Sequence, residues 1–485
     1  MAVNDKDPTE AIQLVEQTIG TFHQIVVGQE GQMVPVPGYP DQPTLAERVK
    51  QNLKPSTDAA GGYAAQASAS AKAADDAAKL ASQITGLETV ADAIGMAALP
   101  LPDVWAPLSD SLRLITGYGR DVLVGSDVVA RMVNFSRSTT KTYRAKDGTL
   151  KVAAVNEPAF EAEGLLLEGQ STNLVPNSKN PPPTTSETSV TLVASPYGDV
   201  FKFAAATTNN SMKDVRFAAL TAGQLVTLSF IAKKAEIDTV AVGFDGMFSA
   251  LFNLTSVSVG GVPSGSSATI TPLGDGFYRV TLTTTTTRDV TPSLRLKVNG
   301  TFVANAVGDG MLIGNLQAQL LPFAGTYIQT TGTAVTCAAD VATLPQSLNL
   351  GESQLGFSLA VEFDTVNSGS FRILELSDFS AIIADGASLT IRHAGKELYG
   401  INAPLGQRHH LAYSVAADGT ITAALNGRLL NPPVKTGGIV SSQTSITLGN
   451  RWTGAKDRAL HGHLRDLKIW TKKPLTADQL KVASA

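Results

Sequence analysis

The feature that most constrains the fold is a series of short runs between residues 187 and 320 in which apolar and polar side chains alternate. One of these runs, Leu225–Lys233, reads LVTLSFIAK. In a strand its two faces would be Val226, Leu228 and Phe230 on one side, and Thr227, Ser229 and Ile231 on the other. Alternation with one dry face is typical of an antiparallel sandwich. The sequence therefore predicts a mainly β fold.

The composition agrees with a mainly β chain of several domains. The 485 residues exceed what one hydrophobic core usually holds. Only 16% of the residues are charged, while 43 glycines and 24 prolines allow many turns. The net charge of −4 argues against a nucleic-acid partner, because phosphate binding needs a basic face. The single cysteine, Cys337, excludes an intrachain disulfide.

Residues 1–58 are expected to combine helix and loop. Ile12, Val15 and Ile19 have the spacing of a short amphipathic helix. Thr44–Glu47 has the pattern of a capping box that opens a second helix. The chain starts without a secretory signal and contains no run of about 20 apolar residues, so we expect a soluble protein without membrane insertion.

Residues 59–90 form an alanine-rich segment with a helical period. Alanine occupies every a and d position over about three heptads: Ala64, Ala67, Ala71, Ala74, Ala78 and Ala81. Alanine favours helix but buries little area, so packing could stabilise such a helix only in a narrow bundle of identical chains. We expect an oligomeric coiled-coil stalk here, and a flexible linker is the alternative.

The alternating pattern restarts near residue 345 with a hairpin series. Asp418-Gly419 and Asn426-Gly427 are strong signals for short turns. The order of strands and turns resembles that of concanavalin A-like jelly rolls of the laminin-G or pentraxin type. The segments that carry this resemblance are Arg408–Val415, Thr420–Leu425, Ser445–Gly449, His461–Trp470 and Pro474–Leu480. This resemblance implies a jelly roll over residues 344–485. Lectins, polysaccharide-degrading enzymes and structural modules share that fold, so it does not select a function.

Three further segments resemble bacteriophage tail fibres and tailspikes. Phe135–Lys151, FSRSTTKTYRAKDGTLK, is similar to the run that precedes a carbohydrate-binding-module-like β-sandwich in those proteins. Phe160–Ser178 and Phe323–Asp340 resemble the entry and exit of that sandwich. The resemblance implies a connector over residues 91–170 and the sandwich over residues 171–343. Cys337 stands where the family usually has arginine, which puts in doubt a salt bridge at the junction of the modules.

The sequence carries no catalytic signature, and no metal or other cofactor is predicted. Cys337 is expected to be a buried, inert side chain. His461 and His463 would share one face of a strand, but a zinc site would need three or four converging ligands. Glycoside hydrolysis would need two carboxyl groups, and the possible pairs are Asp238 with Asp245 and Asp457 with Asp466.

The loop Gly449–Arg458 is the best sequence candidate for sugar binding. An aromatic face with planar polar side chains around it suits a sugar ring, and Trp452 lies between two glycines. The accompanying candidates are Asn450, Arg451, Asp457, Arg458 and, more weakly, Tyr399. Packing of Trp452 against another chain or domain is an open alternative.

The resemblance to tail fibres implies a virion protein, made in the host cytoplasm, that adheres to a host surface polysaccharide. Residues 1–58 would attach it to the phage tail, at the baseplate or a portal-proximal tail protein. A homotrimer would multiply many weak contacts. A structural tail component or adaptor, with sandwiches packed against other virion proteins, is the main alternative. A polysaccharide depolymerase is the third.

Overall fold

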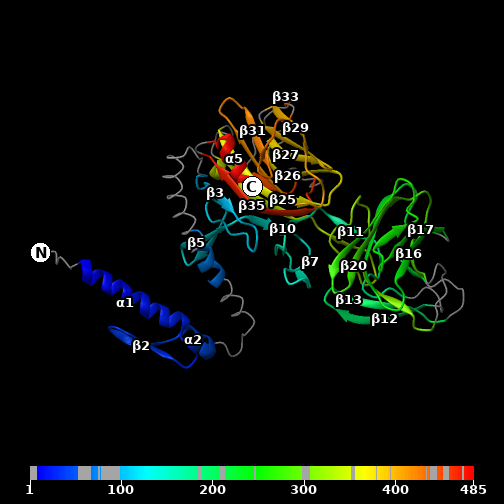
Figure 1. Ribbon diagram of the computed structural model, residues 1–485, viewed down its shortest axis with the longest axis horizontal. Coiled ribbons are helices and arrows are strands. Elements are labelled where there is room, and N and C mark those ends of the chain that lie inside the picture. Colours follow the sequence, from blue (N-terminus) through cyan, green and yellow to red (C-terminus); the bar gives the residue numbers. More distant parts are fainter. Residues whose placement is uncertain are drawn as a thin grey trace. The chain divides into compact units, whose positions relative to one another are not determined.

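The computed structural model describes residues 8–52, 67–74, 77, 99–182, 188–207, 214–244, 247–297, 306–350, 356–377, 380–393, 395–432, 434–436, 445–451, 458–471 and 474–485. The chain forms two units, Met1–Ala98 and Leu99–Ala485 (Figure 1). The predicted β class is confirmed, because the described residues build several antiparallel sheets and only a few helices.

The first unit begins with a long helix, α1 (Pro8–Val27), followed by a β-hairpin and a second helix. The hairpin pairs β1 (Met33–Val36) with β2 (Tyr39–Pro43), and α2 spans Leu45–Asn52. Thr44 caps α2, since its Oγ1 accepts the Glu47 N–H at 3.3 Å. The carboxylate of Glu47 accepts the N–H of Gly31 at 2.7 Å and so ties the loop after α1 to α2. No helix among the described residues combines the length and apolar character needed to cross a membrane.

The described part of the alanine-rich segment is helical but short. Residues 67–74 form a helix in which Ala67, Ala71 and Ala74 are exposed. Ala64, Ala78 and Ala81 lie outside the described residues. The described residues therefore contain no long coiled-coil stalk, and the predicted alanine seam stays a prediction.

The second unit contains two packed pairs of sheets, and we call the first pair the inserted sandwich. One sheet has six strands in the order β12 (Thr188–Ser195), β13 (Gly198–Ala205), β22 (Gly310–Gln319), β15 (Leu225–Lys234), β20 (Phe277–Thr285) and β19 (Ser267–Gly274). The other has five, in the order β14 (Asp214–Arg216), β21 (Ser293–Lys297), β16 (Thr239–Phe244), β17 (Met247–Asn253) and β18 (Ser258–Gly260). Their inner faces share one core, which includes Phe203, Phe230 and Phe252.

We call the second pair of sheets the terminal sandwich. Its first sheet has the order β32 (Arg428–Leu429), β31 (Ile421–Leu425), β30 (His409–Val415), β25 (Phe357–Thr365), β35 (Gly462–Trp470), β10 (Gly164–Leu167) and β9 (Phe160–Glu161), and β3 (Val104–Ala106) also pairs with β35. Its second sheet has the order β33 (Val434–Thr436), β29 (Lys396–Asn402), β28 (Ser388–His393), β27 (Ser380–Asp385), β26 (Ser370–Ser377), β34 (Ser445–Leu448), β24 (Val341–Pro345) and β6 (Asn134–Ser136). One large core fills the space between them. Two short helices, α4 (Gln346–Leu350) and α5 (Ala477–Ala483), accompany these strands.

The segment expected to be a connector contributes four strands to the terminal sandwich. Leu165 of β10 pairs with Leu464 of β35, and Ala342 of β24 pairs with Phe135 of β6. Figure 1 shows β3 and β10 beside the red β35. Trp105 of β3 packs there, and its Nε1 donates to Asp466 at 2.7 Å. The strands of the inserted sandwich therefore lie, in sequence, between β10 and β24 of the terminal one.

Three short ladders complete the second unit. They are β4 (Arg120–Val124) with β5 (Asp127–Met132), β7 (Lys141–Arg144) with β8 (Leu150–Ala153), and β11 (Ser171–Asn173) with β23 (Val335–Cys337). The β11–β23 ladder joins the two chain segments that enter and leave the inserted sandwich. Both crossings between the sandwiches are thereby held next to each other.

The strand β15 differs from its predicted pattern of one dry face. Val226, Leu228 and Phe230 face the core, as the alternation indicates. Thr227 and Ser229 on the opposite face are also buried, with 1% and 3% exposure. Thr227 donates to the carbonyl of Leu321 at 2.7 Å, so the loop after β22 covers this face. This second face is therefore buried as well, because it turns toward the junction of the two sandwiches.

Candidate functional site

A cavity of the second unit lies where the two sandwiches meet. Its volume is about 680 Å3, and strands from both sandwiches and the β7–β8 ladder line it. The polar lining includes Arg144, Glu161, Tyr197, Asn315, Gln317, Arg279, Tyr327, Asp364, Arg408 and His463. We call this cavity the cleft.

Three charged side chains form one wall of the cleft, and we call them the cleft triad. Nδ1 of His463 lies 2.8 Å from Asp364 Oδ1, and Nε2 lies 3.2 Å from Glu161 Oε2. Burial alone would lower the pKa of His463, but the hydrogen bonds to the two carboxylates raise it to about 10. The imidazole is therefore a cation at neutral pH, and it links β9, β25 and β35.

A glycine sets the geometry of this wall. Gly462 begins β35 directly before His463, and a Cβ added to it would collide with the backbone carbonyl oxygen of Asp364. Only a residue without a side chain lets β35 approach β25 this closely. The close approach brings the His463 ring beside the Asp364 carboxylate.

An arginine and a tyrosine stack beside the triad. The guanidinium of Arg144 lies over the ring of Tyr197, 5.4 Å from its centroid. Both side chains donate to the carbonyl of Leu273, each at 2.6 Å. The Arg144 backbone N–H also donates to Glu161 at 2.6 Å. The β7 strand thus connects the triad to the aromatic part of the lining.

Strands of the inserted sandwich supply the opposite wall. Arg279 on β20 donates to the carbonyl of Gly325 at 2.5 Å, and burial lowers the pKa of its guanidinium. Gln317 on β22 is 1% exposed, and its amide donates to the Gly325 carbonyl at 3.1 Å while its Oε1 accepts the Ile328 N–H at 2.8 Å. These contacts fix the loop after β22 against the sheet, so the planar polar groups of this wall are held in place.

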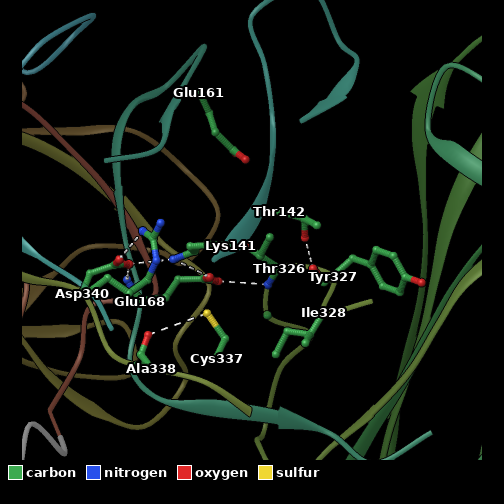
Figure 2. A network of polar contacts seen from close by, with 12 residues as sticks. Lys141, Thr142, Glu161, Glu168, Thr326, Tyr327, Ile328, Cys337, Ala338 and Asp340 are labelled. Carbon is green, nitrogen blue, oxygen red and sulfur yellow. Dashed lines mark hydrogen bonds and ion pairs between the residues drawn. The ribbon is translucent and has the colours of Figure 1, made fainter. Parts of the chain in front are cut away.

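A buried ionic network, which we call the junction cluster, lies where the chain crosses between the sandwiches (Figure 2). Nζ of Lys141 lies 2.6 Å from Asp340 and 2.9 Å from Glu168. Arg137 contacts the other oxygen of Asp340 at 3.0 Å. Glu168 in turn accepts the N–H of Thr326 at 2.9 Å. The four charged side chains are at most 10% exposed, so each depends on its partners for compensation.

The junction cluster shifts the pKa values of its members in the direction of the charged forms. Burial alone would raise the pKa of Glu168, but the charge of Lys141 lowers it to about 2. Burial alone would lower the pKa of Lys141, yet Asp340 and Glu168 raise it well above its usual range. The ionic link thus exists at this junction, with Arg137 and Lys141 as its cations although residue 337 is a cysteine. Cys337 is buried as predicted, with 7% exposure, and burial raises the pKa of its thiol.

The sugar-binding loop predicted from the sequence is described only in part. Trp452 and Asp457 lie outside the described residues. Asn450 is 2% exposed, and its Oδ1 accepts the backbone N–H groups of Arg451 and Arg458, so it braces the loop. Tyr399 on β29 is 38% exposed.

The structure holds Asn450, Arg451 and Arg458 together but places Tyr399 apart from them. Three strands separate β29, which carries Tyr399, from β34, which precedes Asn450, so about 19 Å of sheet lies between them. Within the described part of the chain, none of the four described candidates lines the cleft. Of the carboxylate pairs, Asp245 and Asp457 lie outside the described residues, and Asp466 binds Trp105.

A metal ion has one possible set of ligands among the described residues. Ligand atoms of Glu161, Glu163 and His463 all lie within 4.8 Å of one another. Both ring nitrogens of His463 already face carboxylates, and its pKa of about 10 means that it holds two protons at neutral pH. A metal would have to displace one of these protons, so the donor set fits an ion-paired imidazolium better than a metal.

Sequence reasoning missed most of the cleft because its partners are far apart in the chain. The sequence shows His463 only as a neighbour of His461, whereas its partner Glu161 lies 302 positions away. Arg144 lies in the motif Phe135–Lys151, and Glu161 lies in the motif Phe160–Ser178. The motifs can be found in the sequence, but they do not reveal that these two residues line one cavity. The chain matches no protein-family model, and no curated protein matches it.

Proposed function

We propose that this chain is a non-enzymatic receptor-binding subunit of a bacteriophage tail fibre or spike, and that it binds a host surface glycan in the cleft. Its inserted sandwich would be carbohydrate-binding-module-like and its terminal sandwich concanavalin A-like. Residues 1–58 would attach the subunit to the tail, and a homotrimer would raise the avidity of weak single sites. The motifs in Phe135–Lys151, Phe160–Ser178 and Phe323–Asp340 support the family.

The composition of the cleft is the observation that supports glycan binding most. A sugar needs an aromatic or flat face for its apolar side and fixed planar polar groups for its hydroxyls. The flat guanidinium of Arg144, held over Tyr197, offers the first, and the partly exposed Asn315 and Arg279 offer the second. A volume of about 680 Å3 falls within the range of ordinary ligand sites.

Binding of the tagged full-length chain to whole host cells tests this proposal. We expect binding that periodate oxidation of the surface sugars abolishes. Arg408 lines the cleft and is exposed, so Arg408→Ala should leave folding intact and weaken binding roughly tenfold by removing charged hydrogen bonds. Arg428→Ala is the matched control, because Arg428 is an exposed arginine of the same sandwich on β32, outside the cleft lining.

Two results would contradict the proposal in different ways. Binding that survives Arg408→Ala but is lost in Trp452→Ala would place the glycan site in the loop of residues 449–458. Release of reducing sugar from the host polysaccharide would show a depolymerase.

A structural adaptor is the second candidate, and an exposed apolar ladder favours it. Leu123 and Val124 on β4 are 57% and 67% exposed, and Val128 and Val129 on β5 are 46% and 51% exposed. Such a surface could pack against another virion protein. Val124→Asp would then block virion assembly, whereas a pure receptor-binding role predicts intact particles.

A further inference from the structure

Helix α1 carries an apolar stripe with the spacing of a coiled coil. Ile12, Val15, Ile19, Phe22 and Val26 follow one another at intervals of three, four, three and four residues. These are the a and d positions of consecutive heptads, with Ile12, Ile19 and Val26 at a. All five side chains are between 42% and 66% exposed.

The described residues of the first unit leave the stripe uncovered. β1 and α2 contact α1, and the five side chains stay exposed. In proteins most of the stability of an amphipathic helix comes from packing its apolar face. An open row of this kind on a helix of 20 residues therefore needs a partner.

The sequence around the stripe fits copies of the same helix as that partner. Between residues 12 and 26 only Glu16 and His23 are titratable, and the other polar residues are glutamine, threonine and glycine. Identical helices can thus approach without a row of like charges. Apolar residues spaced alternately three and four positions apart stay at the interface between two supercoiled helices over several turns.

We propose that α1 is the self-association element of this chain and forms a three-stranded coiled coil with two further copies. The d positions carry Val15 and Phe22, whereas leucine at d with β-branched residues at a favours two strands. The seam consists of large side chains, unlike the alanine seam of residues 64–81, so it buries far more apolar area per heptad. The inference is independent of what the cleft binds.

Cysteine cross-linking of the full-length chain tests the seam. Ile19 is the midpoint of the stripe, so it meets its equivalent in a parallel or an antiparallel register. Ile19→Cys should form a disulfide between chains rapidly with copper–phenanthroline, and Gln17→Cys, at the outward f position, should not. Wild-type protein gives the background, since its only cysteine, Cys337, is buried. Equal cross-linking at positions 17 and 19 would overturn the proposal.

Light scattering of the full-length chain tests the stoichiometry. The wild-type mass should be about three times that of the 50.6 kDa chain. Ile19→Asp should abolish this mass, because it places three carboxylates in one layer, while the control Gln17→Asp, at the outward f position, should keep it. A wild type that is not a trimer, or a trimer that survives Ile19→Asp, would contradict the role of α1.

Discussion

Two histidines of the same short segment lie in different surroundings, His461 beside the junction cluster and His463 in the cleft triad, and their pKa values shift in opposite directions. The ring of His461 contacts the ring of Phe323, with their centroids 4.8 Å apart, and burial lowers the pKa of His461 to about 4. Two residues later, His463 is also buried, yet its pKa rises to about 10. The difference comes from the partners. His463 has a carboxylate at each ring nitrogen, whereas His461 feels both signs, since Glu168 raises its pKa and Lys141 lowers it.

This comparison shows that burial alone does not decide the charge of a group. In both regions desolvation acts against the charged form, and direct hydrogen bonds from an opposite charge reverse its effect. The junction cluster uses four charges to balance one another, and the cleft triad uses three. We expect a substitution in either region to lower the stability of the protein, by an amount that depends on which charge it leaves buried without a partner.

The largest effect should come from Lys141→Met. This change leaves Asp340 and Glu168 buried without their shared cation, and breaking a buried ionic network typically costs about 3–5 kcal/mol. Denaturant unfolding of the second unit, followed by tryptophan fluorescence, measures the loss. Adding Glu168→Gln should recover part of the stability, because Arg137 still balances the charge of Asp340. A loss below about 1 kcal/mol for Lys141→Met would show that water already reaches the cluster.

A smaller effect should appear in the pH dependence of stability. His463 has a raised pKa, so its contribution is complete below pH 6.5 and is lost as the pH rises toward 10. His461 has a lowered pKa, so its contribution is complete above pH 6.5 and is lost as the pH falls toward 4. Stability should therefore peak near pH 6.5, and each limb should amount to about 3 kcal/mol over roughly 2.5 pH units on either side.

Single substitutions assign the two limbs. His463→Gln should flatten the alkaline limb of a plot of unfolding midpoint against pH, and His461→Phe should flatten the upper part of the acid limb. Glu168, with its pKa lowered to about 2, adds a further loss below pH 4.5 in both variants. An alkaline limb that persists in His463→Gln would mean that the triad does not hold an imidazolium.

The smallest effect concerns Cys337 beside the junction cluster. Its Sγ lies 3.6 Å from Thr139 Oγ1, and burial raises the pKa of the thiol. Because the thiolate is the reactive form, a thiol reagent should modify the native protein at least tenfold more slowly than the unfolded one. Lys141→Met should remove much of this protection if the cluster closes the junction, whereas Asp364→Asn in the cleft should not.

Local sequence patterns predicted the class of the fold but not its connectivity. The alternation in Leu225–Lys233 and the turns at Asp418-Gly419 and Asn426-Gly427 correspond to β15 and to the turns that flank β31. These signals depend on neighbours in the chain. The pairing of β3 and β10 with β35 depends on residues several hundred positions apart, and no local period encodes it.

The candidate site was harder to predict for the same reason. Trp452 could be named as a candidate for sugar binding because its position between two glycines is visible in the sequence itself. The cleft is built from Arg144, Glu161, Arg279 and His463, which stand in four separate segments and look like ordinary surface charges. These residues come together because one sandwich is inserted into the other. The sequence motifs indicate only where the inserted sandwich begins and ends.

The insertion also sets an order of events during synthesis. Every strand of the inserted sandwich lies between β10 and β24, so this part can fold while the ribosome is still making the rest. β10, with the apolar sequence GLLL, must wait for β35, which is made roughly 300 residues later. At bacterial elongation rates that wait lasts about 15–60 s. During that time the edge of β10 that later pairs with β35 can pair with other strands or other chains. We therefore expect the yield of native protein to depend on chaperones or on slow expression at low temperature.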